Sequence, residues 1–318
     1  MLLLKYKLMK GGDCMAELKE SGGYEARDPH VTYYRGNYYH CFTKGAAAIY
    51  VSKADSVDKL IEAVPVCVYI PEPGKAYSKE LWAPELHIIG EKCYIYVACD
   101  DGNNYNHRMY VLTNDSDEPF SPYHMLGKIS DETDKWAIDG TVFAYKNELY
   151  TIWSGWEGDE NVCQNLYIAK MKDPCAVYSP RVMISTPEYE WEKMDCDGIN
   201  SPYINEGPSA YIKDDKLRII YSASGSWANH YCMGILEFLG GDLLDADQWK
   251  KQAFPALSME DGWNGPGHCS ITTDGEKDYI AFHAYDEGKS KGWSFVHAVI
   301  CPFKIINGKI VIMDDAFN

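Results

Sequence analysis

The sequence predicts an all-β fold, and more specifically a five-bladed β-propeller with a funnel at one end of its central axis. A unit of one short strand candidate, a turn and a second strand candidate recurs five times along the 318 residues. Aromatic residues make up 14% of the chain, and the 25 Tyr among them favour strands. Helix signals are confined to 56–63 and 242–251, which leaves little material for helical layers.

The repeated unit is defined by one polar residue at the start of its first strand candidate. These five anchor residues are Asp28, Glu85, Asp139, Glu206 and His268. Eleven residues after each anchor stands a large apolar or aromatic residue, namely Tyr39, Tyr96, Tyr150, Leu217 and Tyr279. The anchors follow one another at intervals of about 60 residues, which suits a four-stranded blade with generous loops.

The chain is predicted to form a single domain over 1–318, because no Pro- or Ser-rich linker and no change of composition divides it. Residues 1–24 are expected to lead into the first blade. Residues 303–318 are expected to hold a hairpin with an Asn307-Gly308 turn, which helps to close the ring, and then a tail.

Charge and hydropathy exclude several classes of partner. A net charge of −17 argues against nucleic acid or an anionic membrane, both of which attract basic patches. No stretch approaches the roughly 20 apolar residues that span a bilayer. A neutral carbohydrate is compatible with this surface.

The 11 cysteines lack the paired CxxC spacing of a zinc site. Six lie in apolar, strand-like runs and are expected to be buried free thiols: Cys41, Cys93, Cys99, Cys232, Cys269 and Cys301. The opening Met1-Leu2-Leu3-Leu4 is interrupted by Lys5 and Lys7, too early for a signal peptide. The sequence therefore predicts a protein of the reducing cytoplasm.

The anchors also predict chemistry. In a propeller the first strand of every blade lines the central channel, so the anchors are expected to converge at one end of the axis. Hydrolysis of a glycosidic bond uses such a set: one protonated carboxyl donates to the leaving oxygen, and one carboxylate activates water. A third acid near the donor raises its pKa. Taken alone, Glu206 before Gly207 and Pro208 would be an ordinary turn residue.

The motifs around the anchors resemble those of glycoside hydrolase family 43, five-bladed propellers that act with inversion on arabinofuranosides and xylosides. The resemblance runs from Arg27-Asp28-Pro29 to Gly267-His268-Cys269-Ser270 and so covers most of the chain. It implies that Asp28 is the general base and Glu206 the general acid. It implies that Asp139 raises the pKa of the donor and orients it.

The resemblance also implies a binding role for other residues. Trp82 and Glu85, in Trp82-Ala83-Pro84-Glu85, are expected to line the pocket, although Glu85 has the alternative of an ion pair inside the ring. Arg27 and His283 are further candidates for contact with the substrate. His268 matches a histidine that in many members holds a central metal ion, often calcium; no organic cofactor is expected.

One feature of the family is missing. Many members carry an arginine late in the chain that reaches the active site, whereas the last arginine here is Arg218. The candidates to replace it are Lys289, Lys291 and Trp293. Four other tryptophans that follow strand candidates are expected to pack in the core or at the rim: Trp153, Trp156, Trp227 and Trp263.

These observations together predict an inverting exo-glycosidase that removes terminal α-L-arabinofuranosyl residues from arabinan, arabinoxylan or derived oligosaccharides. A β-D-xylosidase and an endo-arabinanase of the same family are the alternatives within this class. A catalytically silent propeller that binds sugar is the alternative outside it, and the presence of all three acids counts against that reading.

Overall fold

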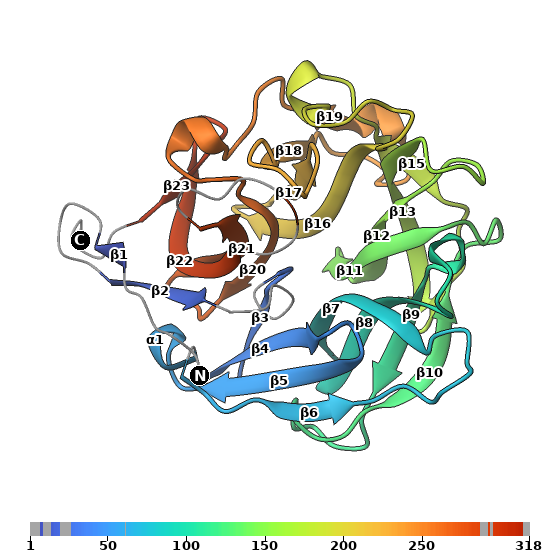
Figure 1. Ribbon diagram of the computed structural model, residues 1–318, viewed down its shortest axis with the longest axis vertical. Helices are drawn as coiled ribbons and strands as arrows, with labels where there is room; N and C mark the ends of the chain where they lie inside the picture. Colours follow the sequence, from blue (N-terminus) through green and yellow to red (C-terminus); the bar gives the residue numbers. More distant parts are fainter. Residues whose placement is uncertain are drawn as a thin grey trace.

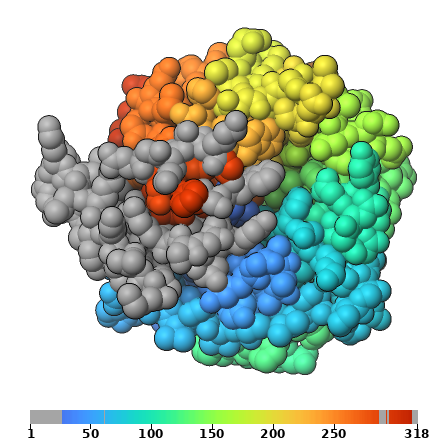
Figure 2. Space-filling model, in the orientation of Figure 1, coloured from blue at the N-terminus to red at the C-terminus, as the bar shows by residue number. Residues whose placement is uncertain are grey.

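The computed structural model describes residues 7–8, 14–19, 27–60, 62–286, 292 and 295–313, with side chains from residue 27 onward. Small antiparallel sheets are arranged around a central axis, as Figure 1 shows. The space-filling view follows the same order around one face, from blue through green and yellow to orange (Figure 2). The prediction of an all-β propeller is confirmed.

The antiparallel pairings divide the strands into five groups along the chain. The first two are four-stranded meanders in which each strand pairs with the next. The first group contains β3 (His30–Tyr34), β4 (Asn37–Lys44), β5 (Ala48–Ala54) and β6 (Val66–Tyr69). The second contains β7 (Lys79–Ile89), β8 (Lys92–Asp100), β9 (Arg108–Thr113) and β10 (His124–Ile129).

The third and fourth groups join into one nine-stranded sheet, because β13 and β16 also form a short parallel pair at Cys163 and Tyr203. The third group contains β11 (Ala137–Tyr145), β12 (Glu148–Gly155), β13 (Cys163–Asp173), β14 (Ala176–Val177) and β15 (Val182–Ser185). The fourth contains β16 (Tyr203–Lys213), β17 (Lys216–Ala223), β18 (Cys232–Phe238) and β19 (Trp249–Lys251).

The fifth group joins the two ends of the chain. Its strands from the C-terminal part are β20 (Gly267–Thr273), β21 (Asp278–Tyr285), β22 (Val296–Ile306) and β23 (Lys309–Ile312). The N-terminal part supplies β2 (Cys14–Lys19), which pairs with β22, and β1 (Lys7–Leu8), which pairs with β2. The N-terminal stretch is thus a strand of the ring as well as a lead-in. The expected hairpin around Asn307 and Gly308 is the β22–β23 pair.

Helices are short, as the sequence predicted. The described residues contain one α-helix, α1 (Val57–Leu60). They also contain four 3-10 turns: η1 (Asn104–Asn106), η2 (Glu190–Glu192), η3 (Ala246–Gln248) and η4 (Met259–Asp261). Within the part of the chain that the structure covers, no helix has the length and apolar character needed to cross a membrane.

The hydrophobic core lies between neighbouring groups of strands. One cluster joins the first and second groups through residues such as Ile49 and Leu86, and another joins the fourth and fifth through Ile220 and Phe282. Comparable clusters lie between the second and third, the third and fourth, and the fifth and first groups. Each blade is therefore stabilised by its neighbours, which fixes the inner strands relative to one another.

In each blade, one residue near the start of the strand closest to the central axis (the inner strand) has a left-handed backbone conformation. These five residues mark the equivalent position in the five repeats. The five residues, with φ between 44° and 55°, are Asp28, Ala83, Asp139, Gly207 and His268. In β7, β11, β16 and β20 this residue lies within a β-bulge. Three anchors from the sequence fall on this position, whereas Glu206 comes one residue before it and Glu85 two residues after it.

Candidate active site

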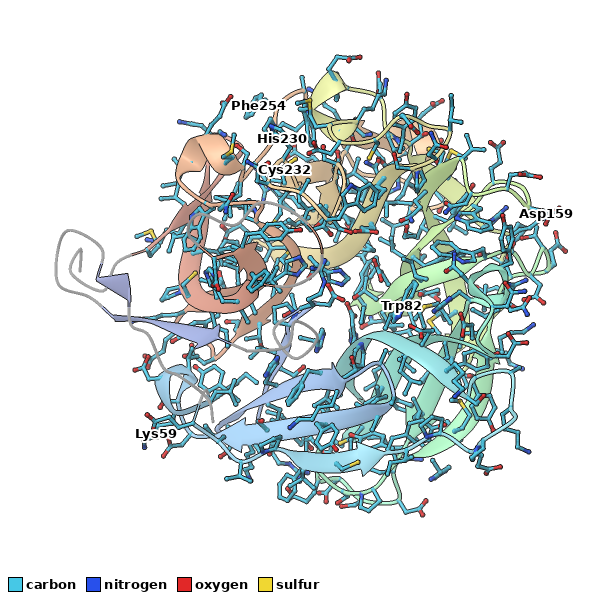
Figure 3. All side chains as sticks on the ribbon, in the orientation of Figure 1. Lys59, Trp82, Asp159, His230, Cys232 and Phe254 are labelled. Atoms are coloured by element: carbon cyan, nitrogen blue, oxygen red, sulfur yellow. The ribbon has the colours of Figure 1, made fainter. Side chains whose placement is uncertain are left out.

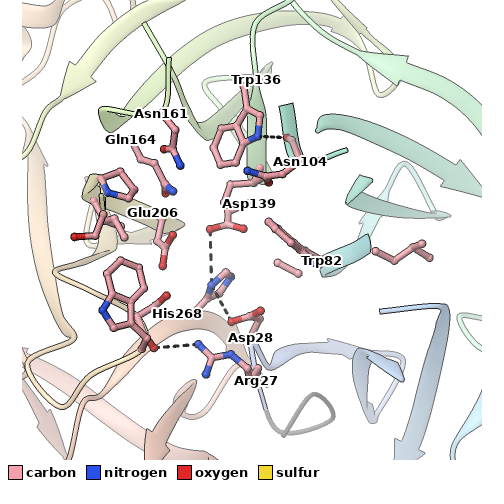
Figure 4. Close-up of a pocket in the computed structure, with 18 of the residues that line it drawn as sticks. Arg27, Asp28, Trp82, Asn104, Trp136, Asp139, Asn161, Gln164, Glu206 and His268 are labelled. Atoms are coloured by element: carbon pink, nitrogen blue, oxygen red, sulfur yellow. Dashed lines mark hydrogen bonds and ion pairs between the residues drawn. The ribbon is translucent and has the colours of Figure 1, made fainter. Parts of the chain in front are cut away.

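A cavity of about 500 Å³ opens where the inner strands begin. Three acids and one histidine of the predicted set line it, namely Asp28, Asp139, Glu206 and His268, and Figure 4 shows them around one space. Each comes from a different blade, so the ring brings together residues that lie far apart in the sequence. Trp82 also lies near the centre of the molecule, whereas Lys59 and Asp159 lie at its edge (Figure 3).

The bulges determine how these side chains are presented. A bulge adds an unpaired residue and bends the strand, which re-aims side chains at the end of a sheet. Gly207 suits its bulge, because its φ is 53° and an added Cβ would lie 3.1 Å from the ring of His268, closer than an ordinary contact. The amide of Gly207 donates a hydrogen bond to Oδ2 of Asp139 at 3.0 Å. The bulge that presents Glu206 therefore also holds Asp139.

His268 is the positive charge among the three acids. Its Nδ1 lies 3.1 Å from Oδ1 of Asp28 and 3.8 Å from Oδ2 of Asp139. Burial by itself would lower the pKa of His268, but the charges of Asp28, Asp139 and Glu206 outweigh burial and raise it. The imidazolium form is therefore favoured, and it partly neutralises the acids around it.

Glu206 and Asp139 are buried carboxyl groups with raised pKa values. Burial, followed by the charge of Asp139, raises the pKa of Glu206 to about 8 against the opposing effect of His268. Burial also raises the pKa of Asp139 to about 6. At neutral pH Glu206 therefore carries a proton that it can donate. Asp28 is more open to solvent, with its side chain 25% exposed.

Aromatic and amide side chains form the remaining walls of the cavity. The indole of Trp82 stacks on the buried ring of His107 with centroids 4.0 Å apart, and Nε1 of Trp136 donates to the carbonyl of Asn104 at 2.7 Å. The amide side chains that line the cavity belong to Asn104, Asn161, Gln164 and Asn200. Apolar faces and amides suit a sugar, which presents C–H faces and hydroxyl groups.

The other predicted binding residues divide into two pairs. Trp82 and Arg27 line the cavity, and Nη1 of Arg27 is buried without a hydrogen-bond partner among the described residues. His283 lies behind Asp28, with its Nδ1 accepting the Asp28 amide at 3.2 Å. Glu85 does not line the cavity: its Oε2 lies 2.7 Å from Nε2 of His87. The structure therefore places Glu85 in the ion pair that was its alternative role.

The register of the repeat explains the position of Glu85. Because Ala83, and not Glu85, occupies the left-handed position in β7, the carboxylate lies two residues further along the strand. Of the four other tryptophans, Trp153, Trp156 and Trp263 are buried, whereas Trp227 lines the cavity. Lys289, Lys291 and Trp293 fall outside the described residues.

One group of described side chains has the residue types of a metal site. His30, Glu85 and His87 place ligand atoms within 4.8 Å of one another. The amide of Leu86 donates to Nδ1 of His30 at 3.1 Å, however, so neutral His30 carries its proton on Nε2, the atom that faces Glu85. At the other candidate, Nδ1 of His268 lies in an ion pair with Asp28, 3.1 Å from its Oδ1. No step of the chemistry below uses a metal.

Sequence reasoning missed Trp136 and the four amide side chains of the cavity wall. It also missed Tyr231. Its hydroxyl donates to Oε1 of Glu206 at 2.9 Å, and its side chain is completely buried. It lies just before β18, 25 residues after Glu206. No anchor spacing points to it, because it precedes the third strand of its blade and not the first.

Comparison with known proteins decides the family. The sequence profile of the glycosyl hydrolases family 43 matches residues 23–304. The chain belongs to this family. It is therefore a glycoside hydrolase, and its partner is a carbohydrate. Like other members of the family, it needs no organic cofactor.

Several proteins that are similar to this chain are named as arabinofuranosidases. The chain is 30% identical to an extracellular exo-α-(1→5)-L-arabinofuranosidase of Streptomyces chartreusis over 81% of this chain and 79% of that protein. It is 29% identical to a protein of the same name from Streptomyces avermitilis, over 80% of this chain and 54% of that longer protein. An α-L-arabinofuranosidase structure from Lactobacillus brevis matches with a TM-score of 0.81 and 29% identity, over 90% of this chain and 93% of that one.

The prediction of a cytoplasmic protein is wrong, because both Streptomyces relatives are named extracellular. The six cysteines expected to be buried free thiols are so in the structure. Burial raises the pKa of thiols such as Cys41 and Cys301, which keeps them protonated and unreactive. Buried thiols therefore behave as small apolar residues, and their presence does not report the compartment.

Proposed function

We propose that this glycoside hydrolase removes terminal α-L-arabinofuranosyl residues with inversion at the anomeric carbon. Glu206 gives its proton to the departing glycosidic oxygen as the C–O bond breaks. Asp28 takes a proton from the water that forms the new bond on the opposite face of the sugar. Asp28 ends the cycle protonated and Glu206 ionised, and exchange with solvent restores both.

The observation that carries this proposal is the contrast between the surroundings of two carboxyl groups in one cavity. Glu206 has a pKa of about 8 and is the proton donor, whereas the more exposed Asp28 pairs with the cation of His268. The negative charge of Asp139 raises the pKa of Glu206 and so preserves the proton between turnovers. Trp82 and Arg27 are proposed to contact the sugar, with Nη1 of Arg27 donating to one of its hydroxyl groups.

Specificity for arabinofuranose is proposed from the names of the relatives, and arabinan or arabinoxylan is the proposed polymer. The test is hydrolysis of matched aryl α-L-arabinofuranosides, aryl β-D-xylosides and linear arabinan, with the anomer of the first product followed by NMR. Release of arabinose as the inverted β-anomer is expected. Preference for the xyloside, or internal cleavage of arabinan, would replace this proposal by the xylosidase or the endo-arabinanase.

The central cation that the resemblance places near His268 is tested separately. Because Nδ1 of His268 is engaged by Asp28, dialysis against EDTA is expected to leave kcat and Tm unchanged. A loss of either that added Ca²⁺ restores would place an ion in the central channel.

A further inference from the structure

Glu206 receives little support from its surroundings. Among the residues that the structure describes, the only hydrogen bond to its carboxyl group comes from the hydroxyl of Tyr231, at 2.9 Å from Oε1. Other ionisable groups face it from several elements without such a bond. They are Asp139 on β11, His268 on β20, Asp28 before β3 and Cys196 in the segment 193–202. Tyr231 is therefore the contact that can fix where this carboxyl group points.

The ring of Tyr231 is itself held firmly. It stacks on His283 with centroids 5.6 Å apart and an interplanar angle of 12°. On another side it lies against Gly267, where an added Cβ would be 2.0 Å from a ring carbon. The Tyr231 amide donates to the carbonyl of Ala228 at 3.2 Å. A completely buried ring with these neighbours has little freedom to move.

The same stack reaches the other catalytic carboxylate. Nδ1 of His283 accepts the backbone amide of Asp28 at 3.2 Å, so a continuous path runs from Asp28 through two stacked rings to Glu206. An inverting glycosidase depends on the separation of its two carboxyl groups, which must leave room for water and sugar. Two rigid rings in contact form a spacer of fixed length between them.

We propose that Tyr231 is the positioning residue of the general acid, and that its stack with His283 sets the placement of Glu206 relative to Asp28. This inference rests on the proposed function, since it takes Glu206 as the proton donor. Tyr231 touches neither water nor sugar in this role and acts only through Glu206.

Tyr231→Phe tests the inference, because it keeps the ring and removes only the hydroxyl. A hydroxyl that donates to a carboxylate favours the ionised form, so its loss raises the pKa of Glu206. The alkaline limb of kcat/KM is expected to move up by roughly one pH unit. With the acid less well aimed, kcat is expected to fall about tenfold on an alkyl arabinoside and much less on a nitrophenyl arabinoside.

Tyr221→Phe is the matched control. Tyr221 is equally buried, and its hydroxyl donates at 2.9 Å to Glu192, a carboxylate outside the cavity. Loss of this hydroxyl is expected to lower Tm. The alkaline limb of kcat/KM and the dependence of kcat on the leaving group are expected to stay as in the wild type. If Tyr231→Phe behaved like Tyr221→Phe in all three measurements, Tyr231 would be a structural residue and the inference would be overturned.

Two further variants complete the test. Tyr231→Phe and His283→Phe are expected to be non-additive in kcat, because each removes a hydrogen bond at one end of the same path from Asp28 to Glu206, whereas additive effects would overturn the coupling. Glu206→Gln separates failure of the inference from failure of the proposed function. An inactive Glu206→Gln beside an unperturbed Tyr231→Phe contradicts only the inference. A fully active Glu206→Gln contradicts the proposed function itself.

Discussion

Two buried glutamates, Glu192 and Glu206, lie in the same part of the molecule and differ in the hydrogen-bond donors and charges that surround their carboxyl groups. Each accepts a tyrosine hydroxyl at 2.9 Å. Glu192 also accepts Nζ of Lys251 at 2.7 Å, the amide side chain of Asn205 at 2.9 Å, and the backbone amides of residues 188 and 189 at 2.8 Å. Glu206 has no such donors among the described residues and lies instead beside Asp139.

The comparison shows what separates a structural carboxylate from a proton donor. Five donors, one of them the cation of Lys251, compensate the carboxylate of Glu192 for its burial. Glu206 is buried without that compensation and next to a like charge, so it keeps its proton to a pH of about 8. Asn205 links the two sites, because its side chain is bound to Glu192 and its backbone leads directly into Glu206.

The largest expected difference between the two glutamates is in catalysis. Glu206→Gln is expected to lower kcat on alkyl arabinosides by about 10²–10⁴-fold, because general acid catalysis is lost, and to spare nitrophenyl arabinosides with good leaving groups. Glu192→Gln is expected to keep the kcat of the wild type per folded molecule. Steady-state kinetics on both substrates checks this, and an equal loss of kcat in the two variants would remove the distinction.

The next difference is in stability. Lys251→Met leaves the buried charge of Glu192 without its cation, and the free energy of unfolding is expected to fall by about 3–5 kcal/mol. Lys309→Met is the control: it breaks a surface pair with Asp261, at 3.0 Å, which contributes about 0–1 kcal/mol. Urea denaturation measures both. Equal losses of unfolding free energy in the two variants would mean that the Glu192 network stabilises the fold no more than a surface ion pair does.

The smallest difference concerns pH. The charge of Asp139 raises the pKa of Glu206, so Asp139→Asn is expected to lower that pKa. Since the protonated form is active, the alkaline limb of kcat/KM should move down by about one pH unit, opposite to the shift expected for Tyr231→Phe. Asp134→Asn removes an exposed charge paired with Lys128 and is expected to leave the limb in place. A limb that stays or rises in Asp139→Asn would exclude this role for Asp139.

The sequence by itself determined the fold class, because alternation of short strands and turns at a regular interval leaves few arrangements other than a ring of blades. It also identified Asp28, Asp139, Glu206 and His268, since a repeat brings equivalent positions to one end of the axis. Trp82 and Arg27 were found through the motifs that contain them. All six residues line the cavity.

Only the tertiary structure decided which residue of each inner strand occupies the equivalent position, which groups surround each buried carboxyl group, and which side chain holds the general acid in place. The left-handed position in β7 belongs to Ala83, and this moves Glu85 out of the cavity and against His87. The donors that surround each glutamate come from distant strands, such as Lys251 for Glu192. Tyr231 could not be found from the repeat for the same reason: burial and hydrogen bonding are set by neighbours in space, which spacing along the chain does not specify.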